Sequence, residues 1–203
     1  MFKLLRKSRL ALALSLACLG VVATPTTAVA ETTFYTTRNH LPDLKFNLEH
    51  TVSQRLTEKD LAGKVVLVYF GYTYCPDICP TSMAELALMK SMLSDEQQDK
   101  VQVVFVSVDP HRDTPERLQK YLDAFGSGAI GLTGTASEIA DIAKRYRVAY
   151  QIEKPKNPAN PELYDVMHAE GIYVFDQRGK ASFLASNSHD IETMHQRIIE
   201  LIN

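Results

Sequence analysis

Two cysteines separated by three residues, Cys75 and Cys79, carry the strongest chemical signal in this sequence. They follow an apolar run, Val65 to Tyr69, which predicts a strand buried on both faces. A helix is expected directly after them, because Pro80 suits a first helical turn and apolar residues then recur at helical spacing. A thiol near a helix N-terminus faces free N–H groups and the positive end of the helix dipole, which favours the thiolate. The pair is therefore predicted to be reactive.

A structural disulfide is the plainer alternative for this pair. A bridge across three intervening residues closes a very short loop, and the chain-entropy model assigns such a bridge roughly 2 kcal/mol. A close cysteine pair at a strand-to-helix junction more often serves redox or metal chemistry. We therefore predict a redox or metal site at Cys75 and Cys79.

The elements around the pair predict an α/β fold. A second β-branched run, Val101 to Val108, follows the cysteine helix, and this order implies two parallel strands joined by a right-handed crossover. Both strands then end at one edge of the sheet, where open α/β sheets usually bind ligands. Asp109 is expected at this edge beside the cysteines, as a turn residue that also shapes the field of the site.

The remaining predicted elements complete one domain. They are a hairpin from Leu44 to Val52 with its first strand over Leu44–Leu48, a helical turn at 57–61, a helix capped by Asp113 or Thr114, a loop over 126–134, a helix with a Thr135–Glu138 capping box, a strand at 148–152, a polar loop at 153–162, a hairpin at 172–184 and a helix at 191–202. Residues 31–40 are expected to be a flexible lead. We predict a thioredoxin-like central mixed sheet flanked by helices, with an added N-terminal hairpin and inserted loops.

The first thirty residues have the pattern of a cleavable signal peptide. Four basic residues precede the apolar stretch Leu10 to Val22, and Ala28-Val29-Ala30 is a small-x-small cleavage site. This stretch of thirteen residues falls short of the roughly 20 that a spanning helix needs, so no stable membrane span is expected in the mature chain. We predict a signal peptide at 1–30 and one domain at 31–203.

The net charge and the number of cysteines restrict the compartments and the classes of partner that fit this protein. The formal net charge of −2 becomes −6 once the four basic residues of the signal are removed. A mildly acidic domain without a basic run has no electrostatic footprint for nucleic acid. Cleavage would also remove Cys18 and leave two cysteines in an oxidising compartment. The predicted location is the periplasm, with anchoring to the outer face of the inner membrane as the alternative.

Three features separate this chain from an ordinary dithiol oxidoreductase. The spacing is C-x-x-x-C, no tryptophan precedes it, and no proline lies between Glu162 and Phe175. Thioredoxins carry a cis-proline facing their cysteines just before the penultimate strand. Here His168 stands close to that place.

Several motifs resemble the SCO/SenC family of copper-handling proteins. They are F-G-Y-T-Y-C-P-D-I-C-P, V-S-V-D-P-H-R-D-T-P-E, I-G-L-T-G-T and the isolated His168 ahead of I-Y-V-F-D. The resemblance implies that Cys75, Cys79 and His168 bind copper, as Cu(I) or Cu(II). It also implies a role in assembling the dinuclear copper site of cytochrome c oxidase, as copper donor or as reductant of the recipient cysteines. Family members commonly have aspartate directly before the histidine, where this chain has Met167.

The expected donors match copper chemically. Two thiolates and one imidazole are soft to borderline ligands suited to Cu(I), and they can also hold Cu(II). Zinc could use the same donors, but a closed zinc site would need a fourth ligand, and none stands at standard spacing. Because a disulfide removes both thiolate ligands, the redox state of the pair should control metal loading.

The leading prediction is a metallochaperone rather than an enzyme. Its implied partners are the copper-site subunit of cytochrome c oxidase and a periplasmic copper donor. The alternative is a thiol-disulfide oxidoreductase acting through Cys75 and Cys79, in which copper is incidental. A peroxidase of the thioredoxin superfamily fits less well, because it would pair one thiol with a histidine. Met83 is interpreted as a core residue, and the histidines at 40, 50, 111, 189 and 195 as structural or exposed.

Overall fold

The structure, a computed structural model, describes residues 31–37, 40–50 and 54–203. Residues 31–203 form one compact unit. The predicted signal peptide at 1–30 and Val52 of the predicted hairpin lie outside the described residues. The strands are β1 (Phe34–Thr36), β2 (Asn47–His50), β3 (Arg55–Thr57), β4 (Val65–Gly71), β5 (Val101–Ser107), β6 (Ile130–Thr133), β7 (Tyr150–Ile152), β8 (Val166–His168), β9 (Ile172–Phe175) and β10 (Ala181–Ala185). The helices are the 3₁₀ helix η1 (Glu58–Leu61), α1 (Ile78–Ser91), α2 (Asp95–Asp99), α3 (Pro115–Asp123), α4 (Ala136–Tyr146) and α5 (Ile191–Ile202).

Eight of these strands form one mixed sheet, in the order β1-β10-β9-β4-β5-β6-β2-β3. The central strands β4, β5 and β6 run parallel, whereas β9 pairs antiparallel with β4 and β2 pairs antiparallel with β6. The β2–β3 hairpin is the N-terminal addition expected from the sequence. The predicted α/β fold, a thioredoxin-like mixed sheet flanked by helices, is confirmed.

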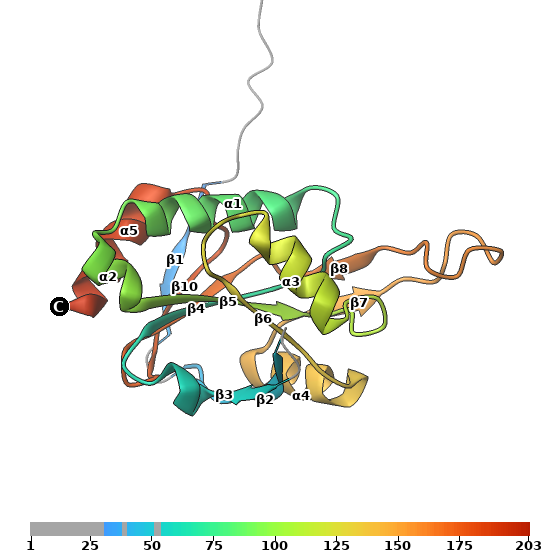
Figure 1. The fold of residues 1–203 in the computed structure, drawn as a ribbon, viewed down its shortest axis with the longest axis horizontal. Helices are drawn as coiled ribbons and strands as arrows, with labels where there is room; N and C mark the ends of the chain where they lie inside the picture. The colour runs from blue at the N-terminus through green and yellow to red at the C-terminus, as the bar shows by residue number, and fades with distance from the viewer. Residues whose placement is uncertain (1–30, 38–39, 51–53) are drawn as a thin grey trace, which may run out of the picture. The chain divides into compact units, whose positions relative to one another are not determined.

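Helices cover both faces of this sheet. Figure 1 shows α1, α3 and α5 on one face and α4 on the other. Every residue of β4 and of β5 is buried, as expected for strands that are covered on both sides. The parallel pairing of β4 with β5 runs in register from Val65–Val101 to Gly71–Ser107, so both strands end together. This shared edge is where α1 begins.

Two segments that we predicted to be irregular contain strands. The predicted flexible lead contains β1, which pairs with β10. The predicted loop over 126–134 contains β6, a central strand between β5 and β2. Both strands are too short for a local alternation pattern to appear, and pairing with distant strands determines their conformation. The predictions for these two segments were wrong.

Other boundaries moved by a few residues. The first strand of the hairpin is Asn47–His50; Leu44 and Phe46 are buried but precede it. The cysteine helix α1 begins at Ile78, so Pro80 lies in its first turn as expected. The Thr135–Glu138 capping box, the hairpin of β9 and β10 and the closing helix are confirmed. None of the described helices is long and apolar enough to cross a membrane.

Candidate metal centre

Cys75 and Cys79 lie at the start of α1, at the edge where β4 ends. Cys75 lies in the turn between β4 and the helix, and its N–H donates to the carbonyl of Tyr72 (3.2 Å). Cys79 is the second residue of α1 and is fully buried, whereas Cys75 is 9% exposed. Both cysteines are free thiols. The backbone N–H of Cys79 donates to Sγ of Cys75 (3.4 Å), which is the helix-terminus contact expected from the sequence.

His168 reaches the thiols from the other side of the site. It is the last residue of β8, which pairs with β7 in a separate two-stranded sheet. Its Nε2 lies 3.2 Å from Sγ of Cys79. The donor atoms of Cys75, Cys79 and His168 all lie within 4.8 Å of one another. The structure therefore brings the three predicted ligands together.

The imidazole is held with Nε2 facing the sulfurs. Its Nδ1 lies 3.0 Å from the carbonyl oxygen of Ala169, and because a carbonyl can only accept, Nδ1 carries the proton and Nε2 keeps its lone pair. The rings of Tyr69 and Tyr72 pack edge-on against the imidazole, at centroid distances of 6.1 and 5.8 Å. Met167 is 55% exposed, and fixing this tautomer needs no carboxylate at that position.

The two thiols differ in charge state. A hydrogen bond from the Cys79 thiol lowers the pKa of Cys75 to about 4, although burial opposes the shift, and the backbone N–H groups of Asp77 and Cys79 assist it. The same contact with Cys75, together with burial, raises the pKa of Cys79. The reduced site therefore holds one thiolate and one thiol.

Alkylation is expected to distinguish these two cysteines. Because its pKa is lowered, Cys75 stays a thiolate throughout the neutral range, and its rate of reaction with iodoacetamide should be constant from about pH 6 to pH 8. The rate should fall only as the pH approaches 4. Peptide mapping should find the label on Cys75, because Cys79 is fully buried. A rate that rises steadily up to pH 9 would contradict this assignment.

The site opens into a pocket of about 390 Å³. Its walls are residues of the cysteine turn and of β8: Tyr72, Cys75, Pro76, Asp77, Ile78, Asp165, Val166, Met167 and His168. Cys75 and His168 line this pocket, so two of the three donors are reachable from outside. Two sulfurs and one imidazole nitrogen form a soft, open donor set that fits copper.

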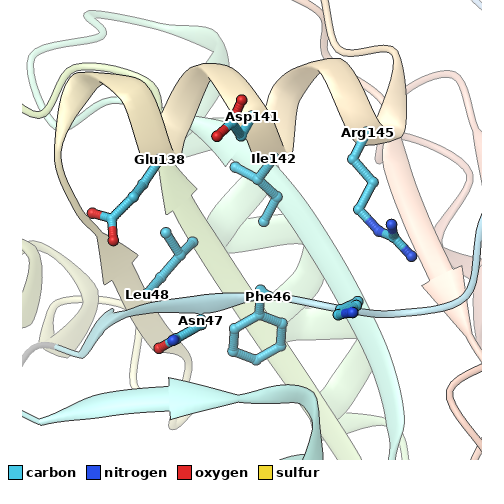
Figure 2. A pocket seen from close by; sticks show the side chains of 8 residues that line it. Phe46, Asn47, Leu48, Glu138, Asp141, Ile142 and Arg145 are labelled. Atoms are coloured by element: carbon cyan, nitrogen blue, oxygen red, sulfur yellow. The ribbon is translucent and has the colours of Figure 1, made fainter.

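Another pocket of about 380 Å³ lies between α4 and the segment that leads into β2. Figure 2 shows Glu138, Ile142 and Arg145 of α4 above Phe46 and Leu48. No cysteine or histidine is among its lining residues, and it contains no part of the ligand cluster. Among the described residues, the two thiols and the Cys-Cys-His cluster lie together at the edge where α1 begins.

Asp113 proved to be a support of the cysteine turn rather than a helix cap. Thr114 caps α3, through its hydroxyl and the N–H of Arg117. The buried carboxylate of Asp113 accepts from the N–H of Thr73 (2.9 Å), from the Thr73 hydroxyl (2.6 Å) and from the Ser107 hydroxyl (2.7 Å). It thus ties the turn before Cys75 to the end of β5. In the sequence, only its position in the short segment between β5 and α3 could have indicated this role.

The other candidate residues have structural places. Met83 is fully buried in the core, in agreement with the sequence-based interpretation. His40 and His111 are exposed, and His189 contacts Glu85 at 3.0 Å. Among the described residues, no other histidine joins the ligand cluster.

The fold and the site define a thioredoxin-like protein with a Cys-Cys-His donor set. The family model SCO1/SenC matches residues 36–203. Protein SCO1 of Saccharomyces cerevisiae mitochondria is 35% identical over 155 residues, which is 76% of this chain and 52% of that protein. Protein SenC of Rhodobacter capsulatus is 39% identical over 133 residues, which is 66% of this chain and 58% of that protein. The chain belongs to the SCO1/SenC family.

Solved structures agree with this assignment. Copper-bound ScoI of Bradyrhizobium japonicum has a TM-score of 0.70 and 33% identity, and the match covers 78% of this chain and 98% of that one. BsSco, described as a member of the Sco family of cytochrome c oxidase assembly proteins, has a TM-score of 0.60, covers 82% of this chain and 98% of that one, and at 20% identity shows the fold alone. The chain spans about half the length of the curated SCO1 protein that it matches.

Proposed function

We propose that this protein is a periplasmic copper metallochaperone that binds copper through Cys75, Cys79 and His168. The observation that carries the proposal is the convergence of the three donor atoms within 4.8 Å, although 89 residues separate Cys79 from His168. The copper bound to a 33% identical relative supports the choice of metal. The donor set supports it independently, because thiolate and imidazole ligands suit copper in either oxidation state.

The open side of the site suits transfer of the metal. Copper held by three protein ligands can accept a fourth ligand from a partner, and the pocket beside Cys75 and His168 gives that ligand access. We propose the copper-site subunit of cytochrome c oxidase as the recipient and a periplasmic copper protein as the donor. Membership of a family that includes SenC and SCO1 supports this choice.

Cytochrome c oxidase assembly could also use the site as a reductant. In that role the Cys75 thiolate and the Cys79 thiol form a disulfide and give up two electrons and one proton. The disulfide of the recipient takes up these electrons, the proton and a second proton from water, and becomes two thiols. The thiolate character of Cys75 favours this second candidate, a thiol-disulfide oxidoreductase. It predicts turnover of a disulfide substrate without any metal.

Copper loading of the purified, reduced protein tests the leading proposal. Cu(II) should produce a thiolate-to-copper charge-transfer band, and His168→Ala should alter this band and weaken binding at least 10-fold, because one of three ligands is lost. His40→Ala is the matched control, since His40 is exposed and outside the ligand cluster. Wild type and His168→Ala binding copper with equal affinity and identical spectra would refute the three-ligand site.

A titration of the reduced and the oxidised protein side by side separates the two candidates. Only the reduced form should bind copper tightly, because a disulfide offers neither thiolate. Equal copper binding by both forms would exclude the cysteines as ligands. Absence of exchange with disulfide substrates in the metal-free protein would count against the oxidoreductase.

A further inference from the structure

A buried ion pair lies beside the metal centre, in the segment after β5. Asp109 is fully buried, Arg112 is 7% exposed, and Nε of Arg112 lies 2.5 Å from Oδ2 of Asp109. Taking both charges out of water is costly unless further hydrogen bonds satisfy them. The other contacts of this pair therefore indicate what it does.

The side-chain hydrogen bonds that the pair makes beyond itself go to the loop that leads into β8, while the guanidinium of Arg112 also lies over the rings of Tyr74 (4.6 Å) and Tyr72 (5.7 Å) in the cysteine turn. Nη1 of Arg112 donates to the carbonyls of Glu162 (2.8 Å) and Tyr164 (2.9 Å), and the guanidinium lies 3.6 Å from the centroid of the Tyr164 ring. The Tyr164 hydroxyl donates to the other carboxylate oxygen of Asp109 (2.7 Å). Asp109, Arg112 and Tyr164, here called the latch, thus join the end of β5 to the loop.

Tyr164 of the latch lies two residues before β8, the strand that ends in His168. β8 begins at Val166, and its described strand partner is β7, so the backbone pairing of this hairpin does not attach it to the eight-stranded sheet. Figure 1 shows β7 and β8 extending beyond the main sheet. The cysteines, by contrast, are anchored directly at the end of β4. The cysteines are therefore held by the eight-stranded sheet and His168 by the two-stranded sheet of β7 and β8.

We propose that Arg112 is a positioning residue for copper binding, which holds the β7–β8 hairpin so that His168 stays within bonding distance of the two thiols. This inference rests on the proposed function and assigns a role to the D-P-H-R-D motif that the metal ligands leave unexplained. Arg112 suits the task because its planar guanidinium can pair with a carboxylate, donate to two carbonyls and stack on an aromatic ring at once.

Arg112→Lys separates this role from charge alone. Lysine keeps the positive charge for Asp109, but its single ammonium cannot reproduce the fork and the stacking. The variant should bind copper about 10- to 100-fold more weakly, the range typical of groups that orient a ligand. The nitrogen hyperfine coupling of Cu(II) in electron paramagnetic resonance should weaken with it. Iodoacetamide labelling of Cys75 should keep its wild-type rate. Arg145→Lys is the matched control, because exposed Arg145 of α4 also donates to a backbone carbonyl, that of Asp43 (3.0 Å), and lies over an aromatic ring, that of Tyr146 at 5.7 Å.

A double-mutant cycle with His168→Ala decides whether Arg112 acts through the imidazole. In the His168→Ala background, Arg112→Lys should change copper affinity less than twofold, because the ligand that it positions is gone. An equal loss in both backgrounds, or no loss in the wild-type background, would overturn the proposal. If Arg112→Lys does not fold, Tyr164→Phe replaces it in the same cycle, since it removes only the hydroxyl bound to Asp109. The three-ligand site itself fails if His168→Ala binds copper like the wild type, whereas the latch alone fails if His168→Ala weakens binding and the latch variants do not.

Discussion

Replacing Asp113 with alanine is expected to lower the free energy of unfolding by about 3 kcal/mol and to weaken copper binding. The substitution removes the common acceptor of Thr73 N–H, the Thr73 hydroxyl and the buried Ser107 hydroxyl. Each buried donor left unsatisfied costs roughly 1–3 kcal/mol, although hydroxyl groups can partly find new partners. The turn that carries Cys75 would also lose its tie to β5. Both effects follow from one side chain that lies outside the Cys-Cys-His cluster.

Thermal unfolding and copper titration measure the two effects separately. A loss of about 3 kcal/mol should lower the melting temperature by roughly 10 °C in a domain of this size. Asp123→Ala is the matched control, because Asp123 is an exposed aspartate at the end of α3. Asp113→Asn should lie between wild type and alanine, since its amide oxygen still accepts. Wild-type stability and copper affinity in Asp113→Ala would show that the turn before Cys75 keeps its conformation without Asp113.

Gly71→Ala is expected to displace Sγ of Cys79 and thereby to weaken copper binding. A Cβ at this last residue of β4 would lie 2.9 Å from Sγ of Cys79 and 3.0 Å from two ring atoms of Phe105. Phe105 is fully buried and cannot withdraw, so the sulfur or the strand end must shift. We expect a loss of about 2 kcal/mol from overpacking. Copper affinity should fall at least 10-fold, because the distance from Cys79 to His168 changes with the sulfur.

Gly134→Ala provides the comparison for this substitution. Its Cβ would meet Oε2 of Glu138 at 2.8 Å, an equally short contact, but with the far end of a flexible side chain and away from the ligands. This variant should keep wild-type copper affinity whatever its stability. Equal copper affinities in the two alanine variants would mean that the position of Cys79 Sγ is not set by the close approach of Gly71.

The chemistry of the cysteine pair could be predicted locally. An apolar run, a close pair of thiols and a proline in a first helical turn lie within about twenty residues, and each indicates its conformation through short-range rules. The parallel pairing of β4 and β5 followed from the order of elements alone. The roles of Asp109 and Asp113 were harder to see. They stand two and six residues after the end of β5, in a segment where an aspartate usually shapes a turn or caps a helix. Only their distant partners, Tyr164 for Asp109 and Thr73 for Asp113, reveal what they hold together.

The sequence by itself determined the α/β class and the position of two cysteines at the start of a helix, and resemblance to a family indicated His168 as the candidate third ligand. The tertiary structure alone decided that Nε2 of His168 lies 3.2 Å from Sγ of Cys79, that β1 and β6 are strands, and that one segment after β5 supports both the cysteine turn and the histidine hairpin. The physical reason is the distance along the sequence over which each kind of interaction acts. Periodicity and capping act within a few residues, whereas these contacts join residues that lie from 26 positions apart (Val104 and Ile130) to 151 positions apart (Phe34 and Ala185), and only the packed chain specifies them.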